Sequence, residues 1–321
     1  MTSSSPSPSP YDPSATDANL VCVTCGTQFP TADRALVPTC PICDDPRQFV
    51  PPAGQSFTTM RDLRATHANE LVPLASSGGG EITFVVTAPK FAIGQRAVLV
   101  RTPAGGNVLW DCVTLVDGRT VDAINALGGL AAIAVSHPHF YSSHAEWSRA
   151  FGGCPVYLAA EDYRRWAQAP APTGRTVLLA PGETEREVEG TGCRLVKLGG
   201  HFPGSMVLLT PSGRLLVADT LLTTPAGTGG WAADALGRPR GRPAGMNTFA
   251  FMWSIPNSIP LSGDEVFRMW SVLKAYDFRA THGGFMGQDI EDERIKERVL
   301  ESMQIQTRAI AWAGHAQWKD V

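Results

Sequence analysis

Metal-binding side chains follow predicted strands at four points along this chain of 321 residues. His137 and His139 come directly after the apolar run AAIAVS, and His201 follows LVKLGG. Asp219 follows RLLVA, and His282 follows DFRAT. Ligands of open α/β folds gather at the carboxyl ends of strands, so side chains in this position are expected to meet. The pattern therefore predicts an α/β protein with a metal site at its strand ends.

Apolar runs that alternate with helical segments support the α/β class. Strands are predicted at residues 81–88, 96–102, 107–112, 131–136, 155–160, 176–180, 193–200, 205–210, 214–219 and 278–284, and helices at 120–129, 143–151, 161–168, 262–277 and 289–313. Two S-x-x-E sequences, Ser143–Glu146 and Ser262–Glu265, have the form of capping boxes, which begin helices. Residues 224–247 are rich in Gly and Pro and predict a long loop, which is either functional or a tolerated surface insertion.

Four cysteines form two C-x-x-C pairs near the start of the chain. Cys22 and Cys25 are followed, after 14 residues, by Cys40 and Cys43, a spacing close to that of a zinc ribbon. The two pairs offer four thiolates to one tetrahedral Zn²⁺ ion, which makes a closed structural site. A redox role is the alternative, but two matched pairs outside a βαβ unit disfavour it. The other cysteines, Cys112, Cys154 and Cys193, lie in apolar sequence and are expected to be buried thiols.

These features predict three regions in the chain. Residues 1–18 are rich in Ser and Pro and are expected to be a disordered tail. Residues 19–50 form a zinc-ribbon-like module, and residues 57–321 form one larger α/β domain. A module this small has too little apolar surface for a core, so metal would supply its folding energy. Whether it docks on the larger domain or binds a protein partner is open at this stage.

The ordered motifs resemble those of the metallo-β-lactamase superfamily. H-x-H after a strand, GGHFPGS, VAD and THGG occur in the family's order across residues 81–285, and Asp111 matches a structural Asp. The resemblance implies a four-layer αβ/βα sandwich. It also implies that a first metal is held by three histidines, that Asp219 bridges two metals, and that a further histidine helps to hold the second. Those histidines are His137, His139 and His201 for the first metal and His282 for the second.

The chain departs from the family pattern H-x-H-x-D-H in its second half. Tyr141 stands at the Asp position and Ser142 at the final His position, while His144 lies two residues later. In one interpretation the loop is longer and His144 is a ligand of the second metal. In the other, His144 only begins the helix after Ser143, and the site holds one metal.

The resemblance predicts a hydrolase with one or two Zn²⁺ ions in its main site. Hydroxide on the metal would attack an ester, thioester, lactone or amide, and Asp219 would hold that nucleophile. Tyr141 either stabilises the oxyanion or packs as an aromatic side chain. Trp253 and Asn257 either line the substrate pocket or have a structural role. The alternatives are a mononuclear iron (Fe) oxygenase acting on thiols or persulfides, and a non-catalytic zinc-binding interaction protein.

Composition limits the partners. The net charge is −3, and the one short basic run, RPRGR, predicts a solvated loop, so nucleic acid is not the expected partner. No apolar run approaches the roughly 18 residues of a membrane span, and the first residues lack the apolar centre of a signal peptide. A cytoplasmic protein with a small-molecule substrate is therefore expected.

Overall fold

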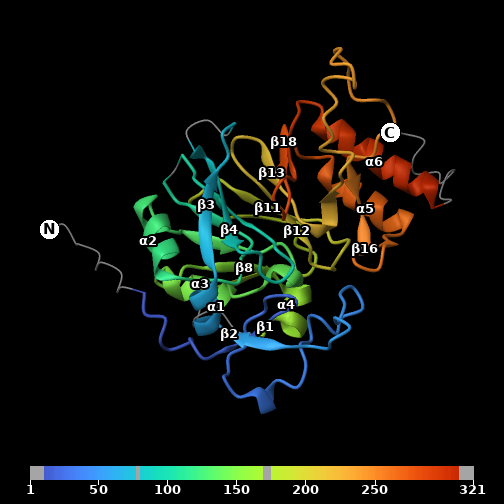
Figure 1. Ribbon diagram of the computed structural model, residues 1–321. Coiled ribbons are helices and arrows are strands. Elements are labelled where there is room, and N and C mark those ends of the chain that lie inside the picture. Colours follow the sequence, from blue (N-terminus) through green and yellow to red (C-terminus); the bar gives the residue numbers. More distant parts are fainter. Residues whose placement is uncertain (1–10, 77–79, 104, 169–174, 311–321) are drawn as a thin grey trace. The chain divides into compact units, whose positions relative to one another are not determined.

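The computed structural model describes residues 11–76, 80–103, 105–168 and 175–310 (Figure 1). The chain divides into two compact units. The first unit comprises Met1–Asp45, Phe49–Leu179 and Val188–Thr191, and the second comprises Pro46–Gln48, Ala180–Glu187 and Gly192–Val321. This division does not follow the predicted boundaries, because the four-cysteine segment clusters with the first half of the predicted α/β domain.

The first unit is built on a seven-stranded sheet in the order β3-β4-β5-β6-β7-β8-β9. These strands are β3 (Ala68–Pro73), β4 (Ile82–Ala88), β5 (Ala97–Val100), β6 (Val108–Trp110), β7 (Ala132–Ala134), β8 (Val156–Ala159) and β9 (Thr176–Leu179). Strands β3 to β6 pair antiparallel and β6 to β9 pair parallel. The parallel strands are connected by α2 (Gly118–Ala126), α3 (His144–Ala150) and α4 (Ala160–Trp166), since parallel pairing needs crossover connections. All these elements except β3 were predicted from the sequence.

Asp111 fixes the point where the loop after β7 begins. It follows β6 and has a left-handed backbone with φ of 61°, a conformation that Asp tolerates better than most residues. Its backbone N–H donates to the carbonyl of Ala134 at 2.8 Å. Its Oδ1 accepts the N–H of Ser136 at 2.7 Å. The carboxylate therefore holds the residue that immediately precedes His137.

The N-terminal part of the first unit is a small strand pair with helices. Strand β1 (Leu20–Cys22) pairs antiparallel with β2 (Phe57–Thr59), a 3₁₀ turn η1 covers Arg34–Leu36, and α1 covers Met60–Thr66. A small apolar cluster joins Val21, Met60 and Leu63 to Leu115 in the loop after β6. The four-cysteine segment therefore packs on the sheet of the first unit. A protein partner for this segment stays a prediction.

The expected disordered tail covers residues 1–10, which lie outside the described residues, and residues 11–18. This second part makes specific contacts in the structure. Tyr11 donates its hydroxyl to the buried Glu146 of α3 and accepts from Arg64 of α1 at 2.8 Å. Asp17 forms an ion pair with Arg64. An aromatic ring and an ion pair thus order a stretch whose composition suggests disorder.

The second unit is built on a six-stranded sheet in the order β10-β11-β12-β13-β18-β19. Its strands are β10 (Glu185–Glu187), β11 (Arg194–Lys197), β12 (Met206–Leu209), β13 (Arg214–Leu216), β18 (Ala280–His282) and β19 (Asp289–Glu291). Only β13 and β18 pair parallel. Two short antiparallel pairs join β14 (Leu222–Thr223) to β15 (Phe249–Ala250) and β16 (Met252–Ser254) to β17 (Ile259–Pro260).

Helices α5 (Gly263–Leu273) and α6 (Ile295–Ala309) cover one face of this sheet (Figure 1). Leu215 and Val217 pack with Met269 of α5 and Val299 of α6 in one buried apolar cluster. Because side chains alternate along a strand, Arg214 and Leu216 face the opposite side of the sheet. That opposite side carries the polar network of His282 described below.

Two sequence predictions need correction. The predicted capping box at Ser143 is wrong, because no cap hydrogen bond forms there. The hydroxyl of Ser143 instead donates to the carbonyl of Thr114 at 2.8 Å, which ties the loop to its neighbour. The predicted helix from residue 289 begins only at Ile295, because Asp289–Glu291 pairs with β18 as strand β19.

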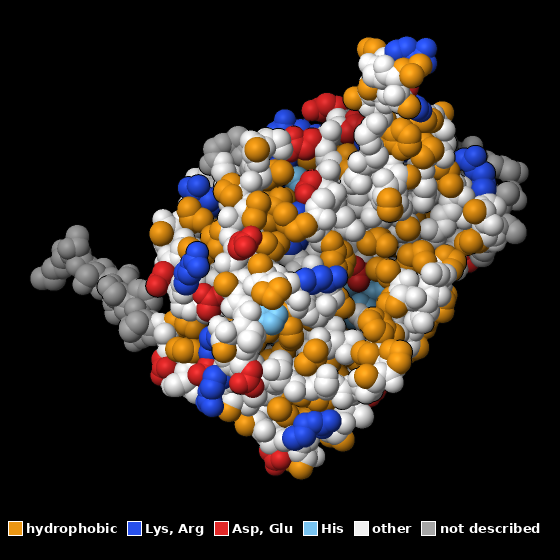
Figure 2. All heavy atoms as spheres, viewed as in Figure 1, with side chains coloured by type: hydrophobic (Ala, Val, Ile, Leu, Met, Phe, Trp, Pro, Cys, Tyr) orange, Lys and Arg blue, Asp and Glu red, His pale blue; other side chains and the backbone are white. Residues whose placement is uncertain are grey.

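Figure 2 shows that positive and negative side chains are interspersed over the face it presents. Within the described ranges, none of the helices combines the length and the apolar character that crossing a bilayer requires.

Helix α5 begins with a capping contact that also fixes a loop. The Ser262 hydroxyl accepts the N–H of Glu265 at 3.3 Å, as the sequence predicts. The Glu265 carboxylate accepts the N–H of Gly200, immediately before His201, at 2.8 Å. It also accepts from Arg268 of the same helix at 2.5 Å. Partial burial alone would raise the pKa of Glu265, but the contacts with Arg268 and Gly200 lower the pKa overall.

We expect Glu265→Gln to lower the free energy of unfolding by about 1 kcal/mol at neutral pH, because a charge-assisted bond to Arg268 is lost. The folded-state pKa of Glu265 lies below the ordinary value of 4.5 for this side chain. Its contribution is therefore complete above that pH and disappears as the pH falls through the folded value. Urea unfolding across this range should show the two proteins converge in acid. Glu297→Gln, in an exposed pair with Arg294, is the matched control. A difference that stays constant down to low pH would contradict this account.

Candidate metal centres

The loop after β7 presents two histidines in the first unit. His137 and His139 flank the start of a 3₁₀ turn, η3 (Pro138–Phe140), and both are buried. Their candidate ligand atoms lie within 4.8 Å of each other. The Nδ1 atom of His137 is 2.9 Å from the hydroxyl of Ser136. His137 would therefore bind a metal through Nε2, the usual arrangement when a neighbour holds the other ring nitrogen.

The second half of this loop differs from the family pattern, and its side chains contact neighbouring protein groups. Ser142 has a left-handed backbone with φ of 45°. His144 is buried at the start of α3, and its Nδ1 donates to the carbonyl of Tyr141 at 2.9 Å. Among the described residues His144 does not join a cluster of candidate ligands.

Tyr141 is buried beside helix α4. Burial first, and then the negative charge of Asp162, raise the pKa of Tyr141 well above its usual value. The phenol therefore stays protonated at neutral pH. A protonated phenol keeps its hydrogen-bond donor, so the oxyanion role and the packing role of Tyr141 both stay predictions.

The second unit presents His201 and Asp219. His201 follows β11, and its Nδ1 donates to the carbonyl of Met252 at 2.9 Å, so Nε2 carries the lone pair. Asp219 begins η4 (Asp219–Leu221) after β13, and its Oδ2 is 3.7 Å from that Nε2 atom. Two ligands of one tetrahedral zinc ion would be about 3.4 Å apart. The pair therefore has a spacing that fits one shared metal ion better than a direct hydrogen bond.

Gly200 allows the His201 loop to pack this closely. Its φ of 87° is in the left-handed region, and a side chain there would meet Thr220 Oγ1 at 2.6 Å. The second glycine of the motif GGHFPGS is therefore required for steric reasons in this structure.

His282 has partners at both ring nitrogens. Asp289 lies opposite it in the β18–β19 pair, and its Oδ1 is 2.8 Å from His282 Nδ1. Arg214 Nη1 is 3.1 Å from His282 Nε2 and 2.6 Å from Glu291 Oε1. A guanidinium only donates, so Nε2 must be the acceptor and Nδ1 must carry the proton. In this arrangement the lone pair of His282 serves Arg214 rather than a metal, and among the described residues His282 joins no cluster of candidate ligands.

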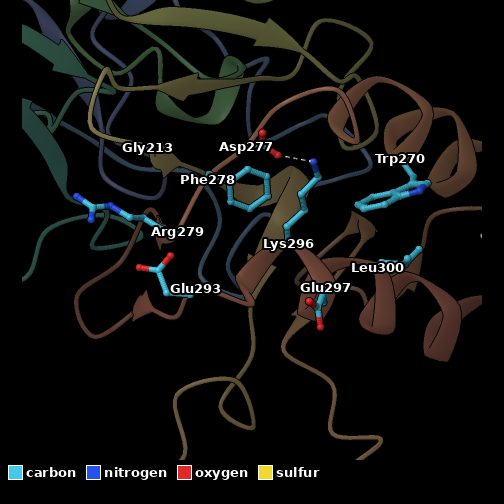
Figure 3. A pocket seen from close by; sticks show the side chains of 9 residues that line it. All are labelled: Gly213, Trp270, Asp277, Phe278, Arg279, Glu293, Lys296, Glu297 and Leu300. Carbon is cyan, nitrogen blue, oxygen red and sulfur yellow. Dashed lines mark hydrogen bonds and ion pairs between the residues drawn. The ribbon is translucent and has the colours of Figure 1, made fainter.

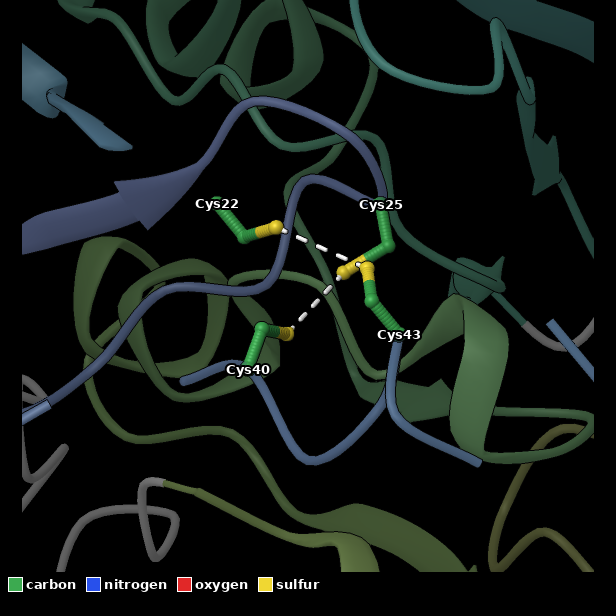
Figure 4. A group of neighbouring side chains, drawn as sticks. All are labelled: Cys22, Cys25, Cys40 and Cys43. Atoms are coloured by element: carbon green, nitrogen blue, oxygen red, sulfur yellow. Dashed lines mark hydrogen bonds between the residues drawn. The ribbon is translucent and has the colours of Figure 1, made fainter. Parts of the chain in front are cut away.

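The four cysteines meet in the first unit (Figure 4). All four are buried and unoxidised, and their sulfur atoms lie within 4.8 Å of one another. The Sγ atoms of Cys22 and Cys43 are 3.7 Å apart, and those of Cys25 and Cys40 are 3.6 Å apart. Sulfur atoms at the corners of a tetrahedron around zinc would be about 3.8 Å apart. The spacing fits four ligands of one metal and is far longer than a disulfide.

The thiols in this cluster perturb one another. Hydrogen bonds, first from Cys25, lower the pKa of the Cys22 thiol. Contacts with Cys22 first of all raise the pKa of Cys25 and of Cys43. The cluster thus favours one thiolate and disfavours further negative charge. A bound cation would stabilise the additional thiolates. By contrast, burial raises the pKa of Cys154 to about 12 and that of Cys112 well above normal, as expected of inert thiols.

Trp253 and Asn257 contact a short segment, Pro46–Gln48, whose role sequence reasoning missed. Arg47, four residues after Cys43, belongs with this segment to the second unit. Its guanidinium lies 5.0 Å from the Trp253 ring centre, and its Nε donates to the carbonyl of His201 at 2.8 Å. The Asn257 amide donates to the carbonyl of Gln48 at 3.1 Å. Both predicted pocket residues therefore hold the segment that leaves the four-cysteine cluster.

A separate pocket of about 580 Å³ lies in the second unit near α5 and α6 (Figure 3). Its lining residues are Gly213, Trp270, Asp277, Phe278, Arg279, Glu293, Lys296, Glu297 and Leu300. Lys296 and Asp277 form an ion pair at 2.9 Å. The lining includes none of the candidate metal ligands, so this pocket is distinct from the ligand loops.

Comparison with known proteins gives the family. No family model matches the chain. The uncharacterized protein YmaE of Bacillus subtilis (strain 168) is 35% identical over 295 residues, which cover 88% of this chain and 92% of YmaE. Among solved structures, DIM-1 metallo-β-lactamase has a TM-score of 0.51 at 13% identity, over 74% of this chain and 98% of its own. The mono-zinc form of FIM-1 metallo-β-lactamase from Pseudomonas aeruginosa has a TM-score of 0.48 at 14% identity, over 75% of this chain and 96% of its own.

At this identity the likeness to DIM-1 concerns the fold alone. The chain has the predicted metallo-β-lactamase fold, and it belongs to the family of the Bacillus subtilis protein YmaE.

Proposed function

We propose that the protein is a metal-dependent hydrolase with one catalytic metal, held by His137, His139 and His201, with Asp219 beside it to hold the attacking water. The observation that carries the proposal is the burial and the spacing of these side chains within each unit. Each unit presents two of them, buried and close together, at the end of a strand. Three imidazoles form the donor set of a catalytic zinc site, in which the fourth position is open to water. The motif resemblance and the fold support the same assignment.

A zinc ion bound in such a set lowers the pKa of water to about 7 and polarises a carbonyl group. Residues of the chain would orient the metal ligands and the attacking water. Met252, through its carbonyl, keeps the proton of His201 on Nδ1 and so presents Nε2. Asp219, acceptor-only when ionised, would hold a water in line with the carbonyl carbon of the substrate. Substrates of this chemistry are small-molecule esters, thioesters, lactones and amides.

The local contacts favour one metal over two. A second metal would need ligands from His282 and from the end of the β7 loop. The lone pair of His282 serves Arg214, and Tyr141 and Ser142 stand where the family has Asp and His. The Arg214 guanidinium is a permanent positive charge that His282 contacts. These observations support a mononuclear site and leave His144 as a buried residue at a helix start.

The four-cysteine cluster we assign to a structural zinc ion. Four thiolates close the coordination shell, so no position remains for water or substrate. Its burial and sulfur spacing support that assignment, and its chemistry sets it apart from the histidine site.

We expect His139→Ala to reduce kcat/KM by more than about 100-fold, because loss of even a supporting contact to a metal ligand commonly costs 10–100-fold. The measurement is hydrolysis of a panel of esters, thioesters and lactones, together with the dissociation constant of the metal. His67→Ala, a histidine of the first unit outside the motifs, should keep wild-type values.

Unchanged metal affinity in His139→Ala would refute the ligand assignment. Turnover of thiols or persulfides with oxygen, with iron in the histidine site and no hydrolysis, would favour the oxygenase alternative.

For the cysteine cluster, we expect Cys25→Ser to lose one metal ion per chain, because three thiolates and a hydroxyl no longer close a tetrahedral site. Elemental analysis of the purified variant gives the count. Cys154→Ser is the matched control, since this buried thiol lies outside the cluster, and it should keep the full metal content. Equal metal content in Cys25→Ser and wild type would contradict the structural-zinc assignment.

A further inference from the structure

The four-cysteine segment touches the metal-ligand loop of the first unit at the residue where that loop leaves the family pattern. The backbone N–H of Gln28 donates to the carbonyl of Ser142 at 3.1 Å. Ser142 is buried and occupies the position of the family's final histidine. Its left-handed backbone turns its carbonyl and hydroxyl toward different partners. A position that in the family pattern would bind metal is used here for a protein contact.

A chain of hydrogen bonds extends this contact to the cysteine turn. Thr114 Oγ1 is 3.0 Å from the carbonyl of Gly26 and 3.2 Å from the hydroxyl of Ser142. The Gln95 amide donates to the Ser142 hydroxyl at 3.2 Å. Because a carbonyl only accepts, Thr114 must donate to Gly26, so the Ser142 hydroxyl donates to Thr114. The direction of every bond from Gln95 to Gly26 is thereby fixed.

Gly26 belongs to the turn that the cysteines create. It follows Cys25 directly, and its N–H donates to the carbonyl of Cys22 at 2.9 Å. A side chain at Gly26 would lie 2.0 Å from Thr114 Oγ1, and its φ of 81° is left-handed. The cysteine turn and the Thr114 side chain are therefore closely packed at Gly26. A change in the position of the Cys25 thiolate must move the Gly26 carbonyl, and with it the bonded chain.

The chain that leaves the cluster makes a second such contact. Arg47 donates to the carbonyl of His201, and its guanidinium lies 4.5 Å from the ring centre of Phe202. The hydroxyl of Ser254 donates to the carbonyl of Arg47 at 3.0 Å, which holds the segment in place. Only three residues separate Cys43 from Arg47. The contact with the His201 loop thus comes from a residue that follows the last cysteine of the cluster closely in the sequence.

We propose that the four-cysteine segment is a positioning element for the metal-ligand loops, acting through Thr114 and Ser142 on the loop of His137 and His139 and through Arg47 on the loop of His201. The proposal rests on the proposed function in naming these loops as ligand loops. Thr114, Ser142 and Arg47 are positioning residues, because they act through the loop backbone. Metal in the cysteine cluster would then affect the histidine site without contacting substrate.

Thr114→Val tests the bonded chain, because valine keeps the shape of threonine and removes its hydroxyl. We expect amide hydrogen exchange of residues 136–144 to accelerate about fivefold to tenfold, the factor for one ordinary hydrogen bond. Exchange in β4 should not change. Thr87→Val is the matched control, since its hydroxyl bonds Asn69 in the same unit, away from the loop. The same exchange measured on Cys25→Ser should show acceleration at residues 136–144.

Exchange at residues 136–144 that is unaffected by Thr114→Val would overturn the proposal. So would unaffected exchange in a folded Cys25→Ser variant that has lost its metal. If Cys25→Ser fails to fold, Thr114→Val alone decides. Hydrogen exchange needs no substrate, so a failure of the hydrolase assignment would appear only in the activity assays. A loss of loop protection with no hydrolysis in wild type would therefore separate the two claims.

Arg47→Lys makes the parallel comparison in the second unit. Lysine keeps the charge but loses the Nε donor and the flat guanidinium. We expect faster exchange at residues 199–205, and unchanged exchange there would remove Arg47 from the proposal. Arg61→Lys, at an arginine whose side chain is 67% exposed, is the matched control.

Discussion

The hydrogen bond at Nδ1 of a buried histidine is the contact on which the proposed site depends, and four histidines of the chain show it. His201 donates from Nδ1 to the carbonyl of Met252, and His144 donates to the carbonyl of Tyr141. His282 donates to Asp289, and Nδ1 of His137 meets the hydroxyl of Ser136. The bonds to a carbonyl or carboxylate oxygen settle the tautomer of His201, His144 and His282, whereas the Ser136 hydroxyl can donate to His137 or accept from it. The tautomer decides whether Nε2 can receive a cation. What differs among the four is the group that Nε2 meets.

For His282 that group is an arginine, which supports the proposal of one metal rather than two. Arg214 lies two residues before Leu216, which pairs with His282 across the parallel strands. The guanidinium is a permanent positive charge that belongs to the chain, whereas a metal ion can dissociate. The loop after β7 also departs from the two-metal pattern, because Ser142, at the position of the family's final histidine, contacts the cysteine segment. Two loops in different units thus depart from the pattern consistently.

The sequence predicted the strands that carry ligands because buried strands and their flanking glycines have strong local signals. The class of fold and the cysteine cluster followed from pattern and spacing, and both are confirmed. The partners of His282 were missed because Arg214 is distant in the chain, and nothing in RLLVA marks its first residue as a histidine's donor. Strand β19 was read as helix because its three residues are set by pairing with β18, not by their own preference. The contact of Ser142 with Gln28 likewise arises only from tertiary packing. The roles given to His137, His139, His201 and Asp219 stay predictions.

The central claim is that one chain holds one structural and one catalytic metal. The most direct test is elemental analysis of the purified, metal-saturated protein, with cobalt substitution to distinguish thiolate from imidazole coordination by the visible absorption spectrum. We expect two metal ions per chain, one with thiolate ligands and one with imidazole ligands. Three ions per chain, with two of them lacking thiolate ligands, would contradict it.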